Sequence, residues 1–288
     1  MQQLIGADAG HGRWWHASAT GSICHRVRPF SDLQLERYAR HIVLPEIGGA
    51  GQRRLLSARV VVVGAGGIGA GLLPWLAAAG IGRIRLIDDD HVSLSNLQRQ
   101  TLFTRADVGA LKVERAARAL ARFNPDCAAE PIAARLDADN VAILLAGADV
   151  VVDGCDNFET RLLVADWCHA ARVPLVSAAV GPFDAQLSTF RGWEPGMACY
   201  RCLVGDEPRA SERSCADAGV LGALVGAIGA LAAIEVMREI AGFGEGLAGR
   251  LLLVDALGMR QRTVGLTKDD GCSVCGAPGR EAPTTAPA

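Results

Sequence analysis

A run of β-branched residues that leads directly into closely spaced glycines is the feature that most constrains the fold of this chain. In ARVVVVGAGGIG, residues 58–69, four consecutive valines precede Gly64, Gly66 and Gly69. Such a run predicts a strand buried on both faces of a parallel sheet. The Gly-x-Gly-x-x-Gly spacing predicts a sharp turn into a helix that begins near Gly67 and points its backbone N–H groups at phosphate oxygens. The alternative is that these glycines only allow close packing of strand and helix.

The rest of the chain alternates between strand-like and helix-like segments. Helices are expected at about 32–41, where Ser31 and Gln34 form a capping box, and at 112–124, 158–171 and 218–241. Further strands are expected at 82–90, 128–134, within 148–157 and at 173–180. This order predicts an α/β fold, a Rossmann-like, mostly parallel sheet flanked by helices. Residues 185–191 and 249–266 look like antiparallel additions, and helix 218–241 is apolar nearly all round, as in a core or a subunit interface.

Charge and hydropathy predict one folded unit with two tails. We expect residues 1–30 to be a flexible extension, residues 31–276 to fold, and residues 277–288, a Pro/Ala/Thr-rich segment, to be disordered. The net charge of −2 gives no electrostatic footprint for nucleic acid or a membrane surface. The longest uncharged apolar run, Val220–Ile234, has 15 residues, too few to cross a bilayer, and no secretory signal is recognisable. A cytoplasmic protein that binds neither nucleic acid nor membrane is expected.

A polar loop follows the acidic end of the second strand. Asp88 lies 24 residues after Gly64, where a carboxylate accepts hydrogen bonds from ribose hydroxyls. Six further polar residues could return to the same edge of the sheet: Asn96, Gln98, Arg99 and Lys112 after that strand, and Asp156 and Asn157 after the strand VVVD.

The charge of this set separates two classes of nucleotide. A dinucleotide rests its pyrophosphate on the glycine turn and needs little further positive charge, whereas a triphosphate brings about four negative charges. Arg99, Lys112 and a magnesium ion held by Asp156 would suit the triphosphate. Lys112 is one of only two lysines in the chain, which suggests a place for a compact ammonium. Two alternatives stay open here: an NAD-dependent oxidoreductase, and a surface salt-bridge set without any ligand.

Four of the nine cysteines form two Cys-x-x-Cys pairs. Cys199 with Cys202 and Cys272 with Cys275 would each grip one side of a tetrahedral ion, which predicts a closed, structural zinc site. A thioredoxin-like role for one pair is the alternative. Cys215 stands apart, just before the long apolar helix, where a helix N-terminus would lower the pKa of its thiol. Cys24, Cys127, Cys155 and Cys168 are expected to pack as small hydrophobic residues.

Several of these motifs occur together in one known family. The segments RYARHIVLPEIGGAGQRRL, GAGGIG, DDDHVSLSNLQRQTLF, DVGALKVERA, GCDN and CYRC resemble the MoeB/ThiF/HesA family over about residues 31–276. Members of that family are bacterial relatives of ubiquitin-activating enzymes. They adenylate the C-terminal glycine of small ubiquitin-like sulfur-carrier proteins, which end in Gly-Gly. The resemblance therefore implies that residues 31–276 form an adenylyltransferase domain.

The resemblance also implies roles for individual residues. ATP would lie on Gly67, with its ribose on Asp88, its phosphates near Asn96, Arg99 and Lys112, and magnesium on Asp156. Arg40 would reach the ATP of the partner subunit of a homodimer, the two cysteine pairs would bind zinc, and Cys215 aligns with a cysteine that in some relatives bonds covalently to the carrier. Four further residues of the same segments are carried over as part of the nucleotide site: Gly64, Gly66, Gln98 and Asn157. A separate protein would donate sulfur, in a molybdopterin-type or thiamine-type pathway.

The chemistry implied by the family is consistent with these residue types. A terminal carboxylate with a pKa of about 3.5 is already an ionised nucleophile at neutral pH, so attack on the α-phosphorus and release of pyrophosphate need no general base. Two further alternatives stay open: a non-catalytic zinc-stabilised dimer that only docks a carrier, and a tRNA-adenosine dehydratase of the same superfamily, against which the two cysteine pairs argue.

Overall fold

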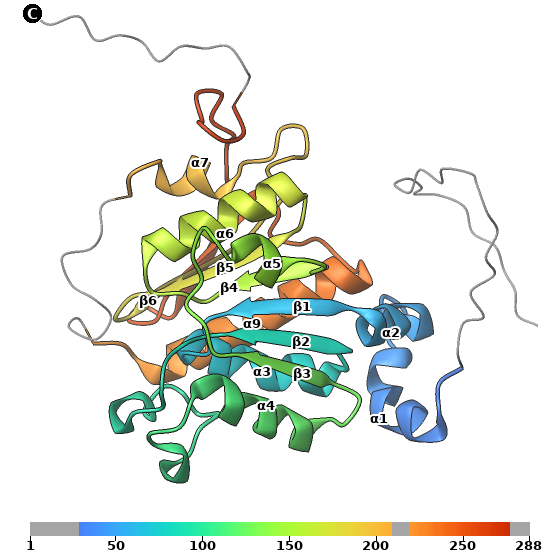
Figure 1. Cartoon of the computed structure of the whole chain (residues 1–288). Helices are drawn as coiled ribbons and strands as arrows, with labels where there is room; N and C mark the ends of the chain where they lie inside the picture. The colour runs from blue at the N-terminus through green and yellow to red at the C-terminus, as the bar shows by residue number, and fades with distance from the viewer. Residues whose placement is uncertain (1–28, 209–218, 277–288) are drawn as a thin grey trace, which may run out of the picture.

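The computed structural model describes residues 29–208 and 219–276, which fold around one eight-stranded sheet (Figure 1). The strand order is β3-β2-β1-β4-β5-β6-β7-β8. The predicted tail at 277–288 and all but the last two residues of the predicted extension at 1–30 lie outside the described residues. The predicted α/β class with a mostly parallel sheet is confirmed.

Five parallel strands are followed by three antiparallel ones. The parallel strands are β1 (Arg59–Val63), β2 (Arg83–Ile87), β3 (Ala128–Ile132), β4 (Val150–Asp153) and β5 (Leu175–Val180). The antiparallel strands are β6 (Asp184–Phe190), β7 (Arg250–Asp255) and β8 (Arg260–Gly265). The antiparallel additions expected at 185–191 and 249–266 are therefore confirmed, and the strand expected at 128–134 ends two residues earlier, at Ile132.

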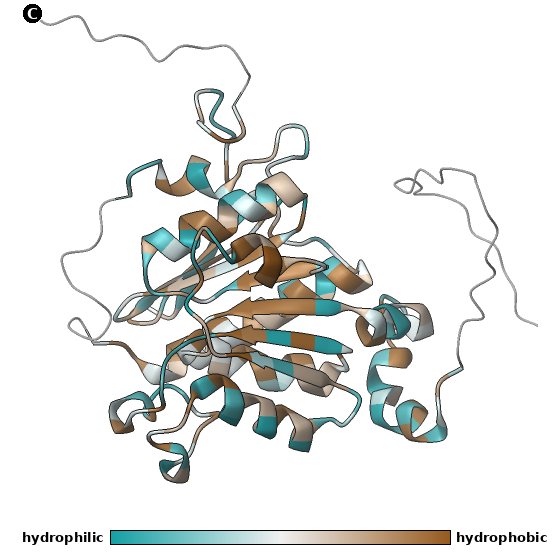
Figure 2. Ribbon diagram, in the orientation of Figure 1, coloured by the Kyte–Doolittle hydropathy of each residue, from teal (hydrophilic) through white to brown (hydrophobic). Residues whose placement is uncertain are grey.

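The alternating side chains of β1 show why the sheet has helices on both faces. Val60 and Val62 pack into one hydrophobic core, and Val61 and Val63 pack into the other. Helices α3 (Gly67–Ala79), α4 (Lys112–Phe123) and α9 (Gly222–Ala241) supply the first core. Helices α5 (Val141–Leu145), α6 (Phe158–Ala171) and α7 (Tyr200–Val204) supply the second. Figure 2 shows the central strands β1 and β4 as almost continuously hydrophobic between these layers.

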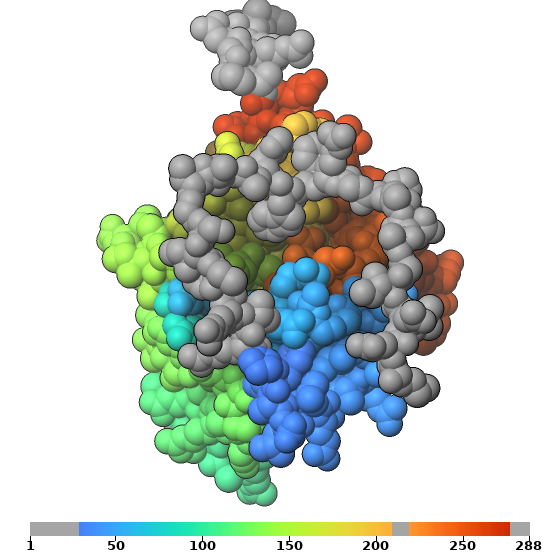
Figure 3. Space-filling view, turned by 90° about the vertical axis from the view of Figure 1, so that its right-hand side faces the viewer, coloured from blue at the N-terminus to red at the C-terminus, as the bar shows by residue number. Residues whose placement is uncertain are grey.

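Two further helices lie where the parallel strands begin. Helix α1 (Asp32–Ile42) starts with the predicted capping box, in which the Gln34 N–H donates to Ser31 Oγ at 3.2 Å. Helix α2 (Gly48–Ser57), which was not predicted, ends two residues before β1. Tyr38 of α1 donates its hydroxyl to Asp126, just before β3. Helices α1 and α2 thus occupy the end of the sheet opposite the carboxyl ends of its parallel strands, and Figure 3 views the molecule with both helices at the front, in blue.

Helix α9 crosses α3 at very close range because both helices carry glycines at the crossing. A Cβ added at Gly71 would lie 2.9 Å from the carbonyl oxygen of Gly226, and one added at Gly229 would lie 2.9 Å from Gly71 Cα. The predicted burial of this helix in the core is confirmed for α9. Its predicted start near residue 218 is wrong: α9 begins at Gly222, seven residues beyond Cys215.

Candidate active site

A cavity of about 670 Å³ opens at the carboxyl ends of the parallel strands. It lies where the strand order reverses, since β1 has β2 on one side and β4 on the other. Ligands of open α/β sheets bind at this point of the topology. The residues that decide its chemistry are Gly64, Gly66, Gly67, Asp88, Asp90, Asn96, Arg99, Gln100, Lys112, Cys155, Asp156, Asn157 and Arg161.

The turn between β1 and α3 needs its glycines for two different reasons. Gly64 has a φ of +95°, and a Cβ there would lie 3.0 Å from the Gly154 carbonyl oxygen. A Cβ at Gly69 would lie 2.5 Å from the Gly64 carbonyl oxygen, so Gly69 lets helix and turn pack together. Gly66, the N-cap of α3, and Gly67, its first residue, line the cavity. The turn therefore serves both packing and exposure of helix N–H groups to a ligand.

Asp88 is fixed by backbone donors at the end of β2. Its Oδ2 accepts the Ala65 N–H at 2.7 Å, and its Oδ1 accepts the Asp90 N–H at 2.8 Å. Burial raises the pKa of Asp88, while the Lys112 ammonium and the two N–H donors oppose that rise. A carboxylate held in this way at the wall of the cavity can accept hydrogen bonds from ribose hydroxyls.

A short 3₁₀ helix, η1 (Leu94–Asn96), decides which residues of the next loop reach the cavity. The N–H groups of Arg99 and Gln100 donate to the Asn96 carbonyl at 3.0 and 2.9 Å, so these three residues share one face. All three line the cavity. Gln98 falls on the opposite face, is exposed, and lies with its backbone carbonyl against Gly222.

Gln98, a predicted nucleotide contact, is not among the residues that line the cavity. Sequence reasoning placed this residue in the site, but Gln100 lines the cavity instead, with a side chain only 3% exposed. Its Oε1 has no partner among the described residues. The helix-like spacing of 96, 99 and 100 was the signal that could have identified it.

Lys112, the first residue of α4, also lines the cavity. Its Nζ lies 2.7 Å from Asp90 Oδ2, and its backbone N–H donates to the Asp90 carbonyl at 2.9 Å. The predicted phosphate-binding cation is thus paired with an acidic residue of the polar loop that follows β2. A second ionised acceptor, such as a phosphate, would compete for the same ammonium.

Asp156 and Asn157 complete the wall beyond β4. Asn157 is the N-cap of α6, and its Oδ1 accepts the Thr160 N–H at 2.9 Å. Asp156 lines the cavity and is exposed. Magnesium is usually held by one or two carboxylates together with substrate phosphates, so Asp156 fits a ligand of that kind.

A buried network that the sequence did not reveal supports this wall. Arg161 of α6, 6% exposed, donates from Nε to the Cys155 carbonyl at 2.9 Å and from Nη1 to the Tyr200 hydroxyl at 3.2 Å, and it also donates to the Ala178 carbonyl. Its charge is balanced by the fully buried Asp153, whose Oδ2 lies 3.6 Å from Nε. Cys155 packs against the second hydrophobic core, as predicted, and it also lines the cavity. Burial raises the pKa of its thiol well above its usual value.

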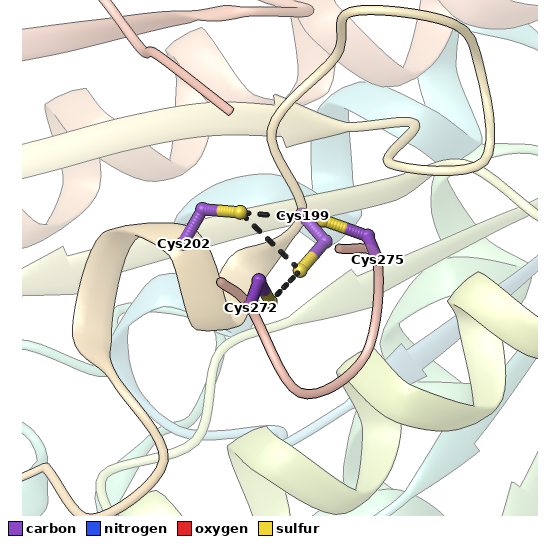
Figure 4. A group of neighbouring side chains, drawn as sticks. All are labelled: Cys199, Cys202, Cys272 and Cys275. Carbon is purple, nitrogen blue, oxygen red and sulfur yellow. Dashed lines mark hydrogen bonds between the residues drawn. The ribbon is translucent and has the colours of Figure 1, made fainter. Parts of the chain in front are cut away.

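The two cysteine pairs meet at one point (Figure 4). The four sulfur atoms lie within 4.8 Å of one another, with separations of 3.8 Å for Cys199–Cys202, 3.5 Å for Cys199–Cys272 and 3.3 Å for Cys202–Cys275. A tetrahedron of thiolates around zinc, with Zn–S of about 2.3 Å, has S–S edges of about 3.8 Å. The cluster therefore fits a closed tetrathiolate site, and the convergence of both pairs disfavours a thioredoxin-like role for one pair.

Hydrogen bonds around the cluster favour its ionised form at one position. Burial opposes ionisation of Cys272, but the N–H groups of Cys275 and Val274 and the thiols of Cys199 and Cys202 outweigh it, so the pKa of Cys272 lies below its usual value. The Asp269 N–H donates to Cys202 Sγ at 3.4 Å. Backbone donors of this kind orient and support metal-binding thiolates.

Two other predicted site residues need separate comment. Arg40 is exposed on α1, at the opposite end of the sheet, and does not line the cavity of its own chain. Cys215 lies outside the described residues, and the helix expected to begin just after it begins at Gly222.

Comparison with known proteins gives concordant matches. Residues 38–274 match the ThiF family. The chain is 47% identical over 247 residues to the SAMP-activating enzyme E1 of Haloferax volcanii, covering 85% of this chain and 90% of that protein. It is 42% identical to the molybdopterin-synthase adenylyltransferase of Escherichia coli (85% and 98% covered) and 43% identical to the sulfur carrier protein adenylyltransferase of Thermus thermophilus (84% and 91% covered).

A solved structure shares the fold. The crystal structure of E. coli MccB with ATP superposes with a TM-score of 0.68 at 26% identity, covering 79% of this chain and 69% of that chain. Among the described residues, no helix is both long and apolar enough to span a bilayer.

Proposed function

This chain belongs to the ThiF family, and on that premise we propose that it is an ATP-dependent adenylyltransferase that activates the C-terminal glycine of a ubiquitin-like sulfur-carrier protein. The product would be an acyl-adenylate, with release of pyrophosphate. The observation that carries the proposal is the convergence of Asp88, Arg99 and Lys112 on one cavity beside the glycine turn. Relatives of nearly the same length, covered to 90% and 98%, are named as enzymes of this kind.

The geometry supports a division of labour within the cavity. The N–H groups at the start of α3 and the cations of Arg99 and Lys112 would neutralise the triphosphate, while Asp88 would accept the ribose hydroxyls. The carrier's carboxylate is ionised at neutral pH, so the protein has to align two anions and offset their repulsion, not to remove a proton. Electrostatic stabilisation by preorganised cations is the catalytic contribution expected of such a site.

Two metals belong to the proposal. Asp156 would hold the magnesium of the nucleotide, which supplies additional positive charge at the phosphates when bound. Zinc on Cys199, Cys202, Cys272 and Cys275 would be structural, because four thiolates leave no open coordination position. It would tie the start of α7 to the segment after β8.

The place of Arg40 supports a homodimer. The Arg40 side chain is exposed at the end of the sheet opposite its own cavity, so any contact of this residue with ATP has to be made to a partner subunit. A carrier ending in Gly-Gly would be the protein substrate, in a molybdopterin-type or thiamine-type pathway. Adenylation transfers only AMP, so sulfur would come from a separate donor protein.

The decisive experiment is exchange of labelled pyrophosphate into ATP, measured with each of a panel of purified carriers that end in Gly-Gly. Exchange is expected with a cognate carrier, and a carrier that lacks the last glycine is the matched control. Arg99→Ala should abolish exchange while the protein stays folded. Carrier-independent exchange, or exchange that survives Arg99→Ala, would contradict the proposal.

A further inference from the structure

We propose that Tyr200 and Arg161 couple the tetrathiolate site to the nucleotide cavity, so that metal and nucleotide strengthen each other's binding. The hydrogen bond from Arg161 Nη1 to the Tyr200 hydroxyl, 3.2 Å long and buried, joins the two sites directly. A second link between α6 and α7, the ion pair of Arg201 with Asp166 at 2.7 Å, involves no residue that lines the cavity. Tyr200 and Arg161 act as positioning residues in this scheme. The proposal rests on the proposed function only in taking ATP as the ligand of the cavity.

On the cavity side, Arg161 holds two backbone segments that form the wall. Its Nε donates to the Cys155 carbonyl, one peptide before Asp156, and Nη2 donates to the Ala178 carbonyl, one residue before the cavity-lining end of β5. Arg161 also lines the cavity itself. A shift of its guanidinium would therefore move the segment that carries Asp156.

On the cysteine side, Tyr200 follows Cys199 directly and is the first residue of α7. Its ring packs edge-on against Phe190, with centroids 5.4 Å apart, and the side chain is buried. Helix α7 has only five residues and carries two of the four sulfur ligands, Cys199 at its N-cap and Cys202 within it. A helix this short has little stability of its own. The ion pair of Arg201 with Asp166 holds α7 to α6, and a metal on the cysteines would further fix its orientation.

The charge of the Arg161 guanidinium is balanced by Asp153, so the hydrogen bond to Tyr200 can serve to position the guanidinium. Asp153 lies 3.6 Å from Arg161 Nε and also accepts the Ser177 hydroxyl at 2.8 Å and the Cys155 N–H at 3.0 Å. The buried guanidinium is therefore neutralised by Asp153 and does not need the phenol hydroxyl for that purpose. The hydroxyl instead fixes the direction of Nη1, and it ties that direction to α7.

Coupling of this kind is reciprocal. If a metal on the four thiolates orders α7 and thereby the wall at Asp156, a nucleotide that prefers the ordered wall must raise the affinity for the metal by the same factor. The full worth of one hydrogen bond to a charged group is an upper limit on this coupling, and we expect a factor of about 5- to 20-fold, at the low end of the usual range.

The test measures binding of a non-hydrolysable ATP analogue, with magnesium, to full-length protein loaded with zinc and to the same protein after chelation. Wild type is expected to lose about 5- to 20-fold in analogue affinity on zinc removal. Tyr200→Phe keeps the ring and its contact with Phe190 but removes the hydroxyl. It should still bind one zinc per chain, bind the analogue more weakly, and show no further loss on chelation.

Zinc release to a competing chelator is the reverse measurement, and it does not depend on enzyme activity. The analogue should slow zinc release from wild type but not from Tyr200→Phe. Tyr38→Phe is the matched control, because Tyr38 is the other tyrosine of the chain, is equally buried, and bonds Asn124 and Asp126 near neither site. Its coupling should equal that of wild type.

The outcomes separate this proposal from the proposed function. Failure of zinc-loaded wild type to bind the analogue would contradict the proposed function. The proposed coupling through Tyr200 and Arg161 would be wrong if the analogue bound equally well with and without zinc, or if coupling persisted in Tyr200→Phe. Neither result would contradict the proposed function. If circular dichroism shows that the protein unfolds when zinc is removed, the zinc-release rates with and without the analogue decide whether the two sites are coupled, because that measurement starts from zinc-loaded, folded protein.

Discussion

The ammonium of Lys112 lies 2.7 Å from Oδ2 of Asp90, and the two residues differ sharply in environment. The Lys112 side chain is 6% exposed, whereas that of Asp90 is 70% exposed. Asp90 therefore keeps a buried cation paired while itself remaining in water. Because a solvated carboxylate is a weak competitor, a triphosphate can take over the ammonium without leaving a buried charge unpaired.

Lys112→Met should strongly reduce adenylation while the protein remains folded. The expected result is a fall of about a hundredfold or more in carrier-dependent pyrophosphate exchange, as for removal of one preorganised electrostatic group. Arg115→Met is the matched control, since Arg115 lies one turn along α4, 3.6 Å from Asp107, and does not line the cavity. Equal losses in the two variants would show that α4 as a whole, and not the Lys112 charge, matters.

Asp88 should give the ribose contact an unusual pH dependence. Burial raises the pKa of Asp88, so its folded-state carboxylate is protonated at a higher pH than an ordinary aspartate. A ribose that donates to the ionised form therefore binds less well as pH falls through this raised pKa. The raised pKa of Asp88 affects stability in the opposite direction. Protonation of a buried carboxylate whose folded-state pKa is raised favours the folded state, so the contribution of Asp88 to the free energy of unfolding increases as pH falls.

The measurement is the ratio of affinities for ATP and for 2′,3′-dideoxy-ATP as a function of pH. The ratio isolates the ribose contact, because protonation of the phosphates affects both nucleotides equally. It should fall toward one on acidification in wild type and stay near one at every pH in Asp88→Asn. A ratio that is independent of pH in wild type would remove Asp88 from the ribose site.

Much of this fold could be predicted because pattern and packing agree. The alternation of β-branched runs with amphipathic segments gave all five parallel strands, and the capping box gave the start of α1. Helix α2 was missed because Gly48, Gly49 and Gly51 weaken its helical pattern, and the structure forms it by packing against α1 and α9. Helix α7 is too short to leave a periodic signal.

The site was predictable in its elements but not in its side-chain directions. Gln98 and Gln100 are chemically identical, and only the turn at η1 shows that Gln100 faces the cavity. Arg161 and Tyr200 were missed because nothing in the sequence relates residues 39 positions apart. Their contact depends on how α6 and α7 pack, which is a tertiary property.

Loss of the tetrathiolate site should destabilise the protein locally and measurably. Cys272→Ser removes one ligand from the segment after β8, so the protein should no longer retain one zinc per chain in a colorimetric metal assay. Its Tm should fall by several degrees, since about 1 kcal/mol shifts Tm by roughly 2–4 °C in a protein of this size. Cys127→Ser, at a buried cysteine outside the cluster, is the control for loss of a thiol. It should keep its zinc.

Mixing of two inactive variants tests whether Arg40 acts across a dimer. Arg40→Ala would disable the partner's cavity, and Lys112→Met disables its own. Co-refolded mixtures should recover about a quarter of wild-type exchange, because half of the dimers are mixed and each has one intact site. If Arg40 served its own cavity or had no catalytic role, mixing would restore nothing beyond the sum of the two variants.

Two neighbouring glycines should separate ligand binding from folding. A methyl group at Gly66 would meet only the Gln100 amide nitrogen, at 3.8 Å, and would stand at the wall of the cavity, where helix N–H groups meet a phosphate. Gly66→Ala should therefore fold with nearly unchanged Tm and bind the ATP analogue at least about tenfold more weakly, a loss of roughly 1.4 kcal/mol.

A methyl group at Gly69 would lie 2.5 Å from the Gly64 carbonyl oxygen, so the turn itself must move. Gly69→Ala should lower the free energy of unfolding by about 1–3 kcal/mol, the usual cost of overpacking. Thermal unfolding and analogue titration on both variants give the comparison. The assignment of separate roles fails if Gly66→Ala loses stability as much as Gly69→Ala, or if Gly66→Ala binds nucleotide normally.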